Sequence, residues 1–299
     1  MAEAPVDAIL APAKRHIWFG TLVVMSAIVF HGTARALIQY SLQDASSSHI
    51  ILIPLISVFL LYVERKQIFG NTRTNLFCGI GLILGGMILF RIANWSYFPQ
   101  SGNLPLTFET LSIVLVWLGG FFLCYGAEAV RAAAFPLLFL LLMIPLPASI
   151  LDRLIYALQE GSTQIAYRIF QAVGTPVLRH GFMLSVPGVT IEVARECSSI
   201  RSSMALFITC LLAAHLYLRT WWKIILLLVL GLLLSVVKNG IRIATLTLLS
   251  IYVDPSFLSG SLHRDGGFAF FLLALLILWP VFAVLEKSDN ARRLMGATN

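Results

Sequence analysis

The chain has 299 residues, of which 59% are hydrophobic and only 12% are charged, and its mean hydropathy is +0.88. This composition excludes an ordinary soluble domain of this size and indicates a protein embedded in a membrane. The formal net charge of +7 does not indicate a nucleic-acid-binding protein, because the 21 Lys and Arg residues lie in short clusters between apolar runs.

A membrane-spanning helix needs about 20 mostly apolar residues, and the sequence contains roughly eight such segments. They are 17–37, 49–64, 75–92, 106–125, 132–149, 197–218, 223–250 and 265–285. The first segment follows "AKRH" and has features of a cleavable signal peptide, but the many later segments favour an uncleaved first helix. The predicted fold class is an all-α polytopic membrane protein with about eight transmembrane helices, forming a single integral membrane domain over residues 1–299.

The distribution of basic residues predicts the orientation of these helices, because short loops rich in Lys and Arg stay in the cytoplasm. The loops "SLQDASSS" and "NWSYFPQSGNLP" contain no Lys or Arg. Basic residues instead recur at alternate ends of the segments, at 14–15, 65–73, 131, 219–223 and 287–293. We therefore expect both termini in the cytoplasm and the insertion from about 147 to 196 on the outer side.

This outer insertion has two parts. Residues 150–174 carry apolar side chains at helical spacing with charged residues between them, which predicts an amphipathic helix along the outer membrane boundary. Residues 175–196, "TPVLRHGFMLSVPGVTIEVARE", are rich in β-branched residues and are interrupted by Gly and Pro. They predict a small β-hairpin that leads directly into Cys197.

Cys197 is unusual because it lies at the N-terminus of a predicted span. Free N–H groups and the helix dipole favour the thiolate there, and Arg201 adds a positive charge one turn later. Alternatively, Cys197 is a packed interfacial residue and Arg201 extends to the headgroups. The other cysteines lie within apolar runs and are predicted to be small buried residues: Cys78, Cys124 and Cys210. No metal or cofactor motif is visible in the sequence.

The turn "LRTWWK" allows the depths of two neighbouring spans to be compared. Cys197 precedes Thr220 by 23 residues, and counting the same distance forward reaches the position next to Arg242. His263 precedes the last span, so the three side chains are predicted to lie in one outer layer. Cys197 would attack a carbonyl, His263 would transfer protons, and Arg242 would stabilise the oxyanion or orient the scissile carbonyl. The alternatives are an Arg242 that extends to the headgroups and a His263 that is an ordinary loop residue.

Three short motifs contain the candidate residues: "ECSSIRSS", "NGIRI" and "LHRDGG". Through these motifs, with weaker matches at "SSSHIILIPLIS", "MIPLP", "LQ" and "VPGVTIEVA", the chain resembles the exosortase/archaeosortase family of polytopic membrane cysteine transpeptidases over about residues 40–285. It implies a bacterial inner-membrane enzyme with Cys197 as nucleophile and Arg242 and His263 as its partners. Its substrates would be exported proteins with a C-terminal Pro-Glu-Pro sorting tail, cleaved through a thioacyl intermediate, with a lipid or glycan as a possible acceptor.

Four further residues are weaker candidates for substrate binding: Arg201, His49, Ser199 and Asn239. Ser199 stands where the family block usually has glycine, which permits a closer backbone approach, so the substrate fit and the subgroup stay open. For His49, a structural role at the membrane boundary is an equal alternative.

Two other functions remain open. The first is a non-enzymatic transporter or an assembly subunit for an exported polysaccharide, since intramembrane charges such as Lys238 and Arg242 suit an anion pathway. No internal repeat or matched pair of broken helices supports it. The second is a rhomboid-like serine protease that uses Ser199 and His263. Against this function, the sequence contains no GxSxG motif and no base deep in a later helix.

Overall fold

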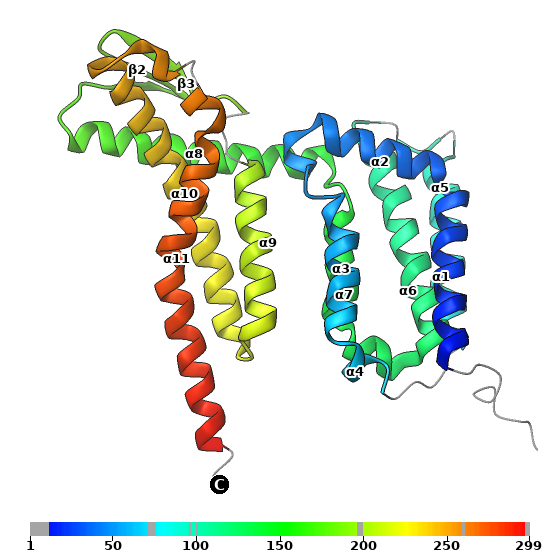
Figure 1. Cartoon of the computed structure of the whole chain (residues 1–299). Coiled ribbons are helices and arrows are strands. Elements are labelled where there is room, and N and C mark those ends of the chain that lie inside the picture. The colour runs from blue at the N-terminus through cyan, green and yellow to red at the C-terminus, as the bar shows by residue number, and fades with distance from the viewer. Residues whose placement is uncertain are drawn as a thin grey trace, which may run out of the picture. The chain divides into compact units, whose positions relative to one another are not determined.

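The computed structural model describes residues 12–70, 76–95, 97–99, 101–195, 200–258 and 261–296. Contacts divide the chain into two compact units, Met1–Leu151 and Asp152–Asn299, which are described in turn. Helices dominate both units (Figure 1), in agreement with the predicted class. The expectation of a single membrane domain stays a prediction.

The first unit consists of helices and short 3-10 turns. They are α1 Pro12–Val29, α2 His31–Gln43, η2 Ala45–Ser47, α3 Leu52–Val63, α4 Arg65–Ile68, α5 Leu76–Ala93, α6 Leu104–Ala132, α7 Ala134–Phe139 and η3 Leu140–Met143. Glycines let α5 and α6 pack closely, since a Cβ added at Gly79 would lie 2.9 Å from the carbonyl oxygen of Gly119. Helix α6 bends at Gly126, where φ is 81°.

The predicted first span, 17–37, is not one continuous helix. The chain turns by 78° between 14–29 and α2, and Figure 1 shows α2 lying across the end of α1. Helix α2 is too polar for a span, and it buries Thr33, whose hydroxyl donates a hydrogen bond of 2.8 Å to Oε2 of Glu109 on α6. The hydrogen bond from Thr33 thus joins α2 to α6 after the bend.

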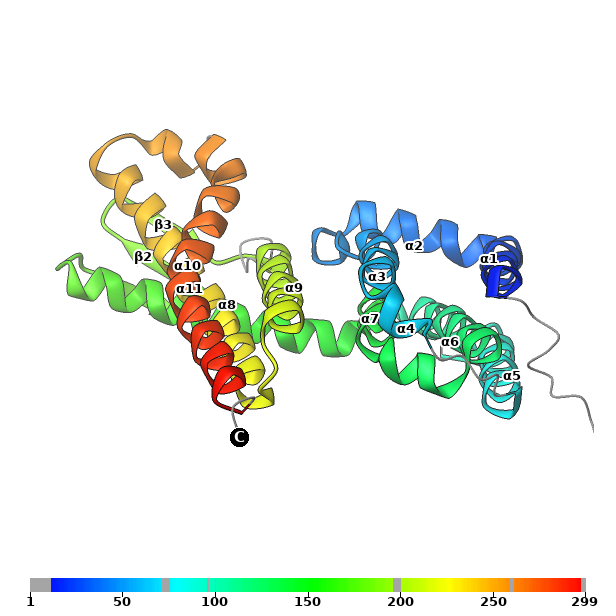
Figure 2. The same ribbon diagram turned by 60° about the horizontal axis from the view of Figure 1, so that its bottom comes forward.

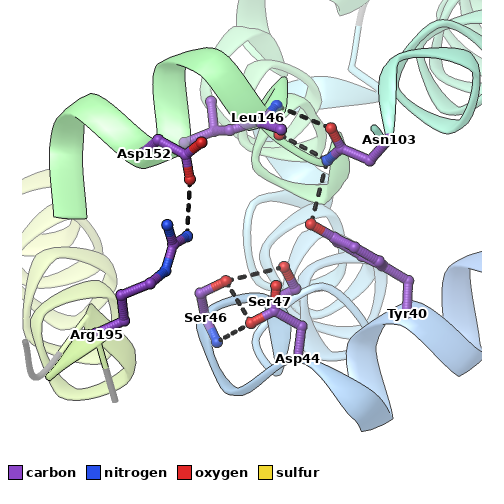
Figure 3. Close-up of polar contacts among 9 residues, drawn as sticks. Tyr40, Asp44, Ser46, Ser47, Asn103, Leu146, Asp152 and Arg195 are labelled. Atoms are coloured by element: carbon purple, nitrogen blue, oxygen red, sulfur yellow. Dashed lines mark hydrogen bonds and ion pairs between the residues drawn. The ribbon is translucent and has the colours of Figure 1, made fainter. Parts of the chain in front are cut away.

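The predicted fifth span, 132–149, is also interrupted. Helix α7 and η3 end before Pro145 and Pro147, which cannot continue a helix, and α8 then leaves at 91°. The Asn103 amide secures this break (Figure 3): it donates to the carbonyl of Leu146 at 2.7 Å and to the Tyr40 hydroxyl at 3.1 Å, and it accepts from the backbone N–H of Ala148 at 2.9 Å.

The second unit contains most of α8, a small sheet and three long helices. The elements are α8 Ala148–Ala172, β1 Leu178–His180, β2 Met183–Val186, β3 Val189–Glu192, α9 Ile200–Tyr217, α10 Trp221–Tyr252, η5 Pro255–Leu258 and α11 Ser261–Gly296. Helix α8 runs crosswise to α9, α10 and α11 in both views (Figures 1 and 2). The predicted helix over 150–174 is thus confirmed, and its place at a membrane boundary stays a prediction.

The predicted β-hairpin is a three-stranded antiparallel sheet in the order β1-β2-β3. Pro187 and Gly188 connect β2 to β3, with Gly188 at φ 84°, a combination typical of a type II turn. The sheet packs against α8 and α10 through a shared core: Ala166, Phe170, Leu184, Val186 and Ala244. The sequence prediction missed β1 because that strand has only three residues.

Length and apolar composition identify four helices among the described residues that could cross a membrane, or six when each bent pair counts as one. Two further apolar helices, α3 and α5, are shorter. Each predicted segment falls on a helix or a bent pair, but the number of eight spans stays a prediction. Cys124 and Cys210 are buried as predicted, whereas Cys78 is exposed, because an apolar run does not distinguish a packed face from a lipid-facing one.

Candidate functional site

Helices α9 and α10 form an antiparallel pair centred on Thr220, as the sequence predicts. Ser202 precedes Thr220 by 18 residues and Lys238 follows it by 18, and the Lys238 ammonium donates to Oγ of Ser202 at 2.6 Å. Nearer the turn, a Cβ added at Gly231 would lie 2.9 Å from Sγ of Cys210. Since these pairs are matched along the helices, positions equally far from Thr220 lie at equal levels.

A layer of buried polar side chains lies at the end of this helix pair. Ser203 and Ser235 share a hydrogen bond between their hydroxyl groups. Nδ2 of Asn239 donates to Oγ of Ser162 at 3.0 Å, which adds α8 to the layer. All four side chains are buried, as is Lys238. Buried polar groups that are hydrogen-bonded in this way fix how their helices lie against each other.

Two glycines allow α8 to cross α10 closely at this layer. A Cβ added at Gly240 would lie 2.5 Å from Cγ2 of Ile165, and one added at Gly161 would lie 2.6 Å from Cγ1 of Val236. Side-chain atoms do not approach this closely, so a larger residue at either position would separate the helices. The glycines therefore hold the neighbouring residues of α10 in register with α8.

Helix α8 also holds the segment that leads to Cys197. The side-chain amide of Gln159 donates to the carbonyl of buried Val193 at 2.8 Å, and the N–H of Val193 donates to the carbonyl of Phe182 at 3.0 Å. Arg195 forms an ion pair of 2.7 Å with Asp152 (Figure 3), although both side chains are more than half exposed. The backbone is therefore fixed four residues before Cys197.

Arg242 lies one turn after Lys238 on α10. Its side chain is partly buried, and its Nε atom is buried. Arg242 follows Thr220 by 22 residues, whereas the first described residue of α9, Ile200, precedes Thr220 by 20. By the register of the pair, Arg242 lies just beyond the described start of α9, on the side from which the chain enters that helix.

The backbone of His263 lies in the first turn of α11, while its side chain is outside the described part of the structure. The turn η5 leads into this helix and packs against both α10 and α11. Asp254 caps η5 by accepting from the N–H of Ser256 at 2.7 Å, and hydrogen bonds from the Ser256 side chain and backbone lower the pKa of Asp254. The start of α11 is thereby held near the C-terminal end of α10.

The other candidates differ in how far the structure describes them. Cys197 and Ser199 lie outside the described residues. Arg201 is exposed in the first turn of α9. Asn239 is buried and bonded to Ser162, an arrangement that favours a structural role. His49 is partly buried in a turn of the first unit and is not placed relative to the other candidates.

Sequence reasoning missed the part played by α8. Its buried face carries Gln159, Ser162 and Thr163 among apolar residues. Polar side chains on the apolar face of an amphipathic helix indicate contact with other polar groups of the protein, and this signal was present in the sequence. The role of Ser202 was not visible, because its partner Lys238 is known only once two helices are paired.

Comparison with known proteins gives one result that bears on identity. The chain matches the family described as transmembrane exosortase (EpsH) over residues 41–280. Neither the curated proteins nor the solved structures gave a match. The matched region includes α3 to α10 and most of the apolar part of α11, so it contains every element of the layer described above. The chain therefore belongs to the transmembrane exosortase family.

Proposed function

We propose that the chain is a membrane-embedded cysteine peptidase and transpeptidase that cleaves C-terminal sorting tails of the Pro-Glu-Pro type from exported proteins. The observation that carries the proposal is the α9–α10 register, which brings Arg242 to the level at which the chain enters α9. Cys197 lies in that entering segment, three residues before Ile200. Family membership supports the same kind of activity.

The proposed reaction has two steps. His263 accepts the thiol proton, the Cys197 sulfur attacks the scissile carbonyl, and Arg242 donates hydrogen bonds to the oxyanion. The C–N bond then breaks, the amine leaves with the proton from His263, and a thioester remains on Cys197. In the second step a hydroxyl or amine of a lipid or glycan acceptor, or water, attacks the thioester and returns the thiol.

The proposed location is the bacterial inner membrane, with both termini in the cytoplasm and residues 147–196 on the outer side. An exported substrate held by an apolar tail presents its cleavage site at this outer boundary. Helix α10 supports this depth for Arg242, because its 32 residues extend about 48 Å and exceed a hydrocarbon core of about 30 Å. About 20 residues from Trp221 reach the far boundary, close to Arg242.

The test is in-cell processing of a reporter with a sorting tail, with crosslinking of the tail as a separate measure of binding. Cys197→Ala and Cys197→Ser should abolish processing while the protein stays inserted, because a hydroxyl is a much weaker nucleophile without a matched base. Cys124→Ala and Cys210→Ala are matched controls, because both cysteines are buried and neither is a candidate site residue. Normal processing by Cys197→Ala would favour a transporter or assembly subunit instead.

Arg242→Lys separates a catalytic role from extension to the headgroups. Lysine reaches the headgroups as well as arginine does, but it lacks the planar pair of donors. Loss of one oxyanion donor lowers the rate by about 10² to 10³ in known acyl-transfer sites, so processing should fall severely. His263→Ala should slow processing while tail crosslinking persists.

A further inference from the structure

Lys238 is a buried cation in an unusual environment. Only 4% of the residue is exposed, and its ammonium contacts a neutral hydroxyl, Oγ of Ser202, at 2.6 Å. The nearest charge on the same helix face is Arg242, which has the same sign. Within the ranges that the structure describes, no Asp or Glu forms an ion pair with Lys238.

A second buried lysine in the same unit provides a comparison. Lys223 is 1% exposed, and its ammonium pairs with Asp289 at 2.8 Å and donates to Oγ of Ser288 at 2.7 Å. This set of partners is what a purely structural buried lysine requires, since an uncompensated charge in a low-dielectric interior is strongly unfavourable. Lys238 is buried to a similar extent but has only a hydroxyl partner among the described residues.

Charged side chains within a membrane are rare and commonly mark a substrate or ion pathway. The ammonium has three N–H donors, and Ser202 accepts one of them. The close crossing of α8 at Gly240 and the Asn239–Ser162 hydrogen bond hold this part of α10 in place. A fixed, buried cation with free donors is suited to a compact anionic group such as a carboxylate.

We infer that Lys238 binds a carboxylate side chain of the peptide substrate, while Arg242 acts on the scissile carbonyl. The inference rests on the proposed function and assigns the two cations different tasks. Four residues of helix correspond to about 6 Å, and successive residues of an extended peptide are about 3.5 Å apart. The recognised acidic residue should therefore lie within about two residues of the cleaved bond.

A peptide carboxylate fits this position better than a lipid phosphate does. A headgroup approaches from the bilayer and needs an exposed cation, whereas only 4% of Lys238 is exposed and its ammonium contacts Ser202 of α9. A peptide bound at Arg242 brings its own acidic side chain to the protein interior. The acceptor headgroup then needs no direct contact with Lys238.

The test compares two reporters, one with the acidic residue of the tail and one with Glu replaced by Gln. The wild-type enzyme should prefer the acidic tail. Lys238→Met should reduce processing of the acidic tail by about 10-fold to 100-fold, which corresponds to the loss of a hydrogen bond to a charged group. Processing of the Gln-containing tail should change little. The preference then disappears. Lys238→Arg keeps the positive charge and should therefore retain part of the preference for the acidic tail.

Lys287→Met is the matched control, since it removes an exposed lysine at the other end of α11 and should keep the wild-type preference. Tail crosslinking in the Cys197→Ala background measures the same preference as binding alone, so a failed catalytic assignment stays distinguishable from a failed assignment of Lys238. The inference is overturned if the Lys238→Met enzyme still prefers the acidic tail, or if the substitution lowers processing of both tails equally. It is also overturned if the effect of Lys238→Met requires anionic lipid in reconstituted vesicles.

Discussion

Lys223 and Asp289 form an ion pair of 2.8 Å in which only 1% and 4% of the side chains are exposed. Asp289 also accepts hydrogen bonds from the N–H groups of Arg219 and Thr220, at 2.6 and 3.2 Å, and from the Thr220 hydroxyl at 2.5 Å. Thr220 is the N-cap of α10, and its own side chain makes no cap hydrogen bond. One carboxylate from α11 thus secures the turn between α9 and α10.

Removing one partner of this pair should destabilise the protein strongly. Asp289→Ala or Lys223→Met leaves a buried charge without its partner, which costs about 3–5 kcal/mol in other proteins. The double variant should be more stable than the sum of the single losses predicts. Thermal unfolding in detergent measures the effect, and Asp152→Asn, which breaks an exposed pair, should cost less than about 1 kcal/mol. Equal losses of stability from breaking the Lys223–Asp289 pair and the Arg195–Asp152 pair would contradict a special role of the buried pair.

The sequence predicted the α9–α10 turn and its register because two long apolar runs flank a short basic connection. It could not predict the Lys223–Asp289 pair, since 66 residues separate the partners and each also suits a solvated loop. The bend after α1 was missed for a related reason. Hydropathy alone does not distinguish a span from a short helix such as α2 whose polar residues find partners within the protein.

Gln159→Leu should reduce processing through the position of the nucleophile. The change leaves the buried carbonyl of Val193 without the amide that donates to it, which costs about 1–3 kcal/mol locally and loosens the segment before Cys197. We expect processing to fall by about 10-fold, with a changed alkylation rate of Cys197 and an unchanged level of inserted protein. Gln171→Leu, an exposed change on the same helix, should alter neither value.

A role of Gln159 in stability alone makes a different prediction. In that case the melting temperature and the amount of protein would fall while the alkylation rate of Cys197 in the folded fraction stayed at the wild-type value. Gln159→Glu provides a second comparison, because a carboxylate cannot donate to the Val193 carbonyl and should impair processing at least as much as leucine.

Gly240→Ala should disturb the crossing of α8 and α10. The added methyl group would lie 2.5 Å from Ile165 and 3.0 Å from the carbonyl oxygen of Ser162, so the helices must separate. Overpacking of this kind costs about 1–3 kcal/mol. Ile165→Ala should partly rescue the Gly240→Ala variant by making room. Gly81→Ala is the control, because nothing lies within 4 Å of the added Cβ and alanine favours a helix.

The candidate site was only partly predictable for a physical reason. Residue chemistry and the distance from one turn predicted Cys197, Arg242 and His263 as site residues, and they stay a prediction. The polar layer around Lys238 and Asn239 depends on which faces of α8, α9 and α10 contact one another. Small residues such as Gly161 and Gly240 determine where α8 and α10 can pack closely, and this role is visible only once the partner helix is in place.

The orientation in the membrane is tested by thiol labelling, since the basic loops are expected to stay in the cytoplasm. His180 at the end of β1 and Arg219 at the α9–α10 turn are both exposed. In a variant without native cysteines, which must include removal of exposed Cys78, an impermeant maleimide should label His180→Cys in intact cells. Arg219→Cys should be labelled only after the inner membrane is permeabilised.

The two positions control each other, because both are exposed in the same unit and are predicted to lie on opposite sides of the membrane. Labelling of Arg219→Cys but not His180→Cys in intact cells would place Arg242 and the entry to α9 in the cytoplasm. A substrate processed after export could then not reach Cys197, so the inverted result would refute the proposed reaction as well as the topology. Labelling of both positions in intact cells would indicate a leaky membrane, which the cysteine-free protein and a cytoplasmic marker protein detect independently.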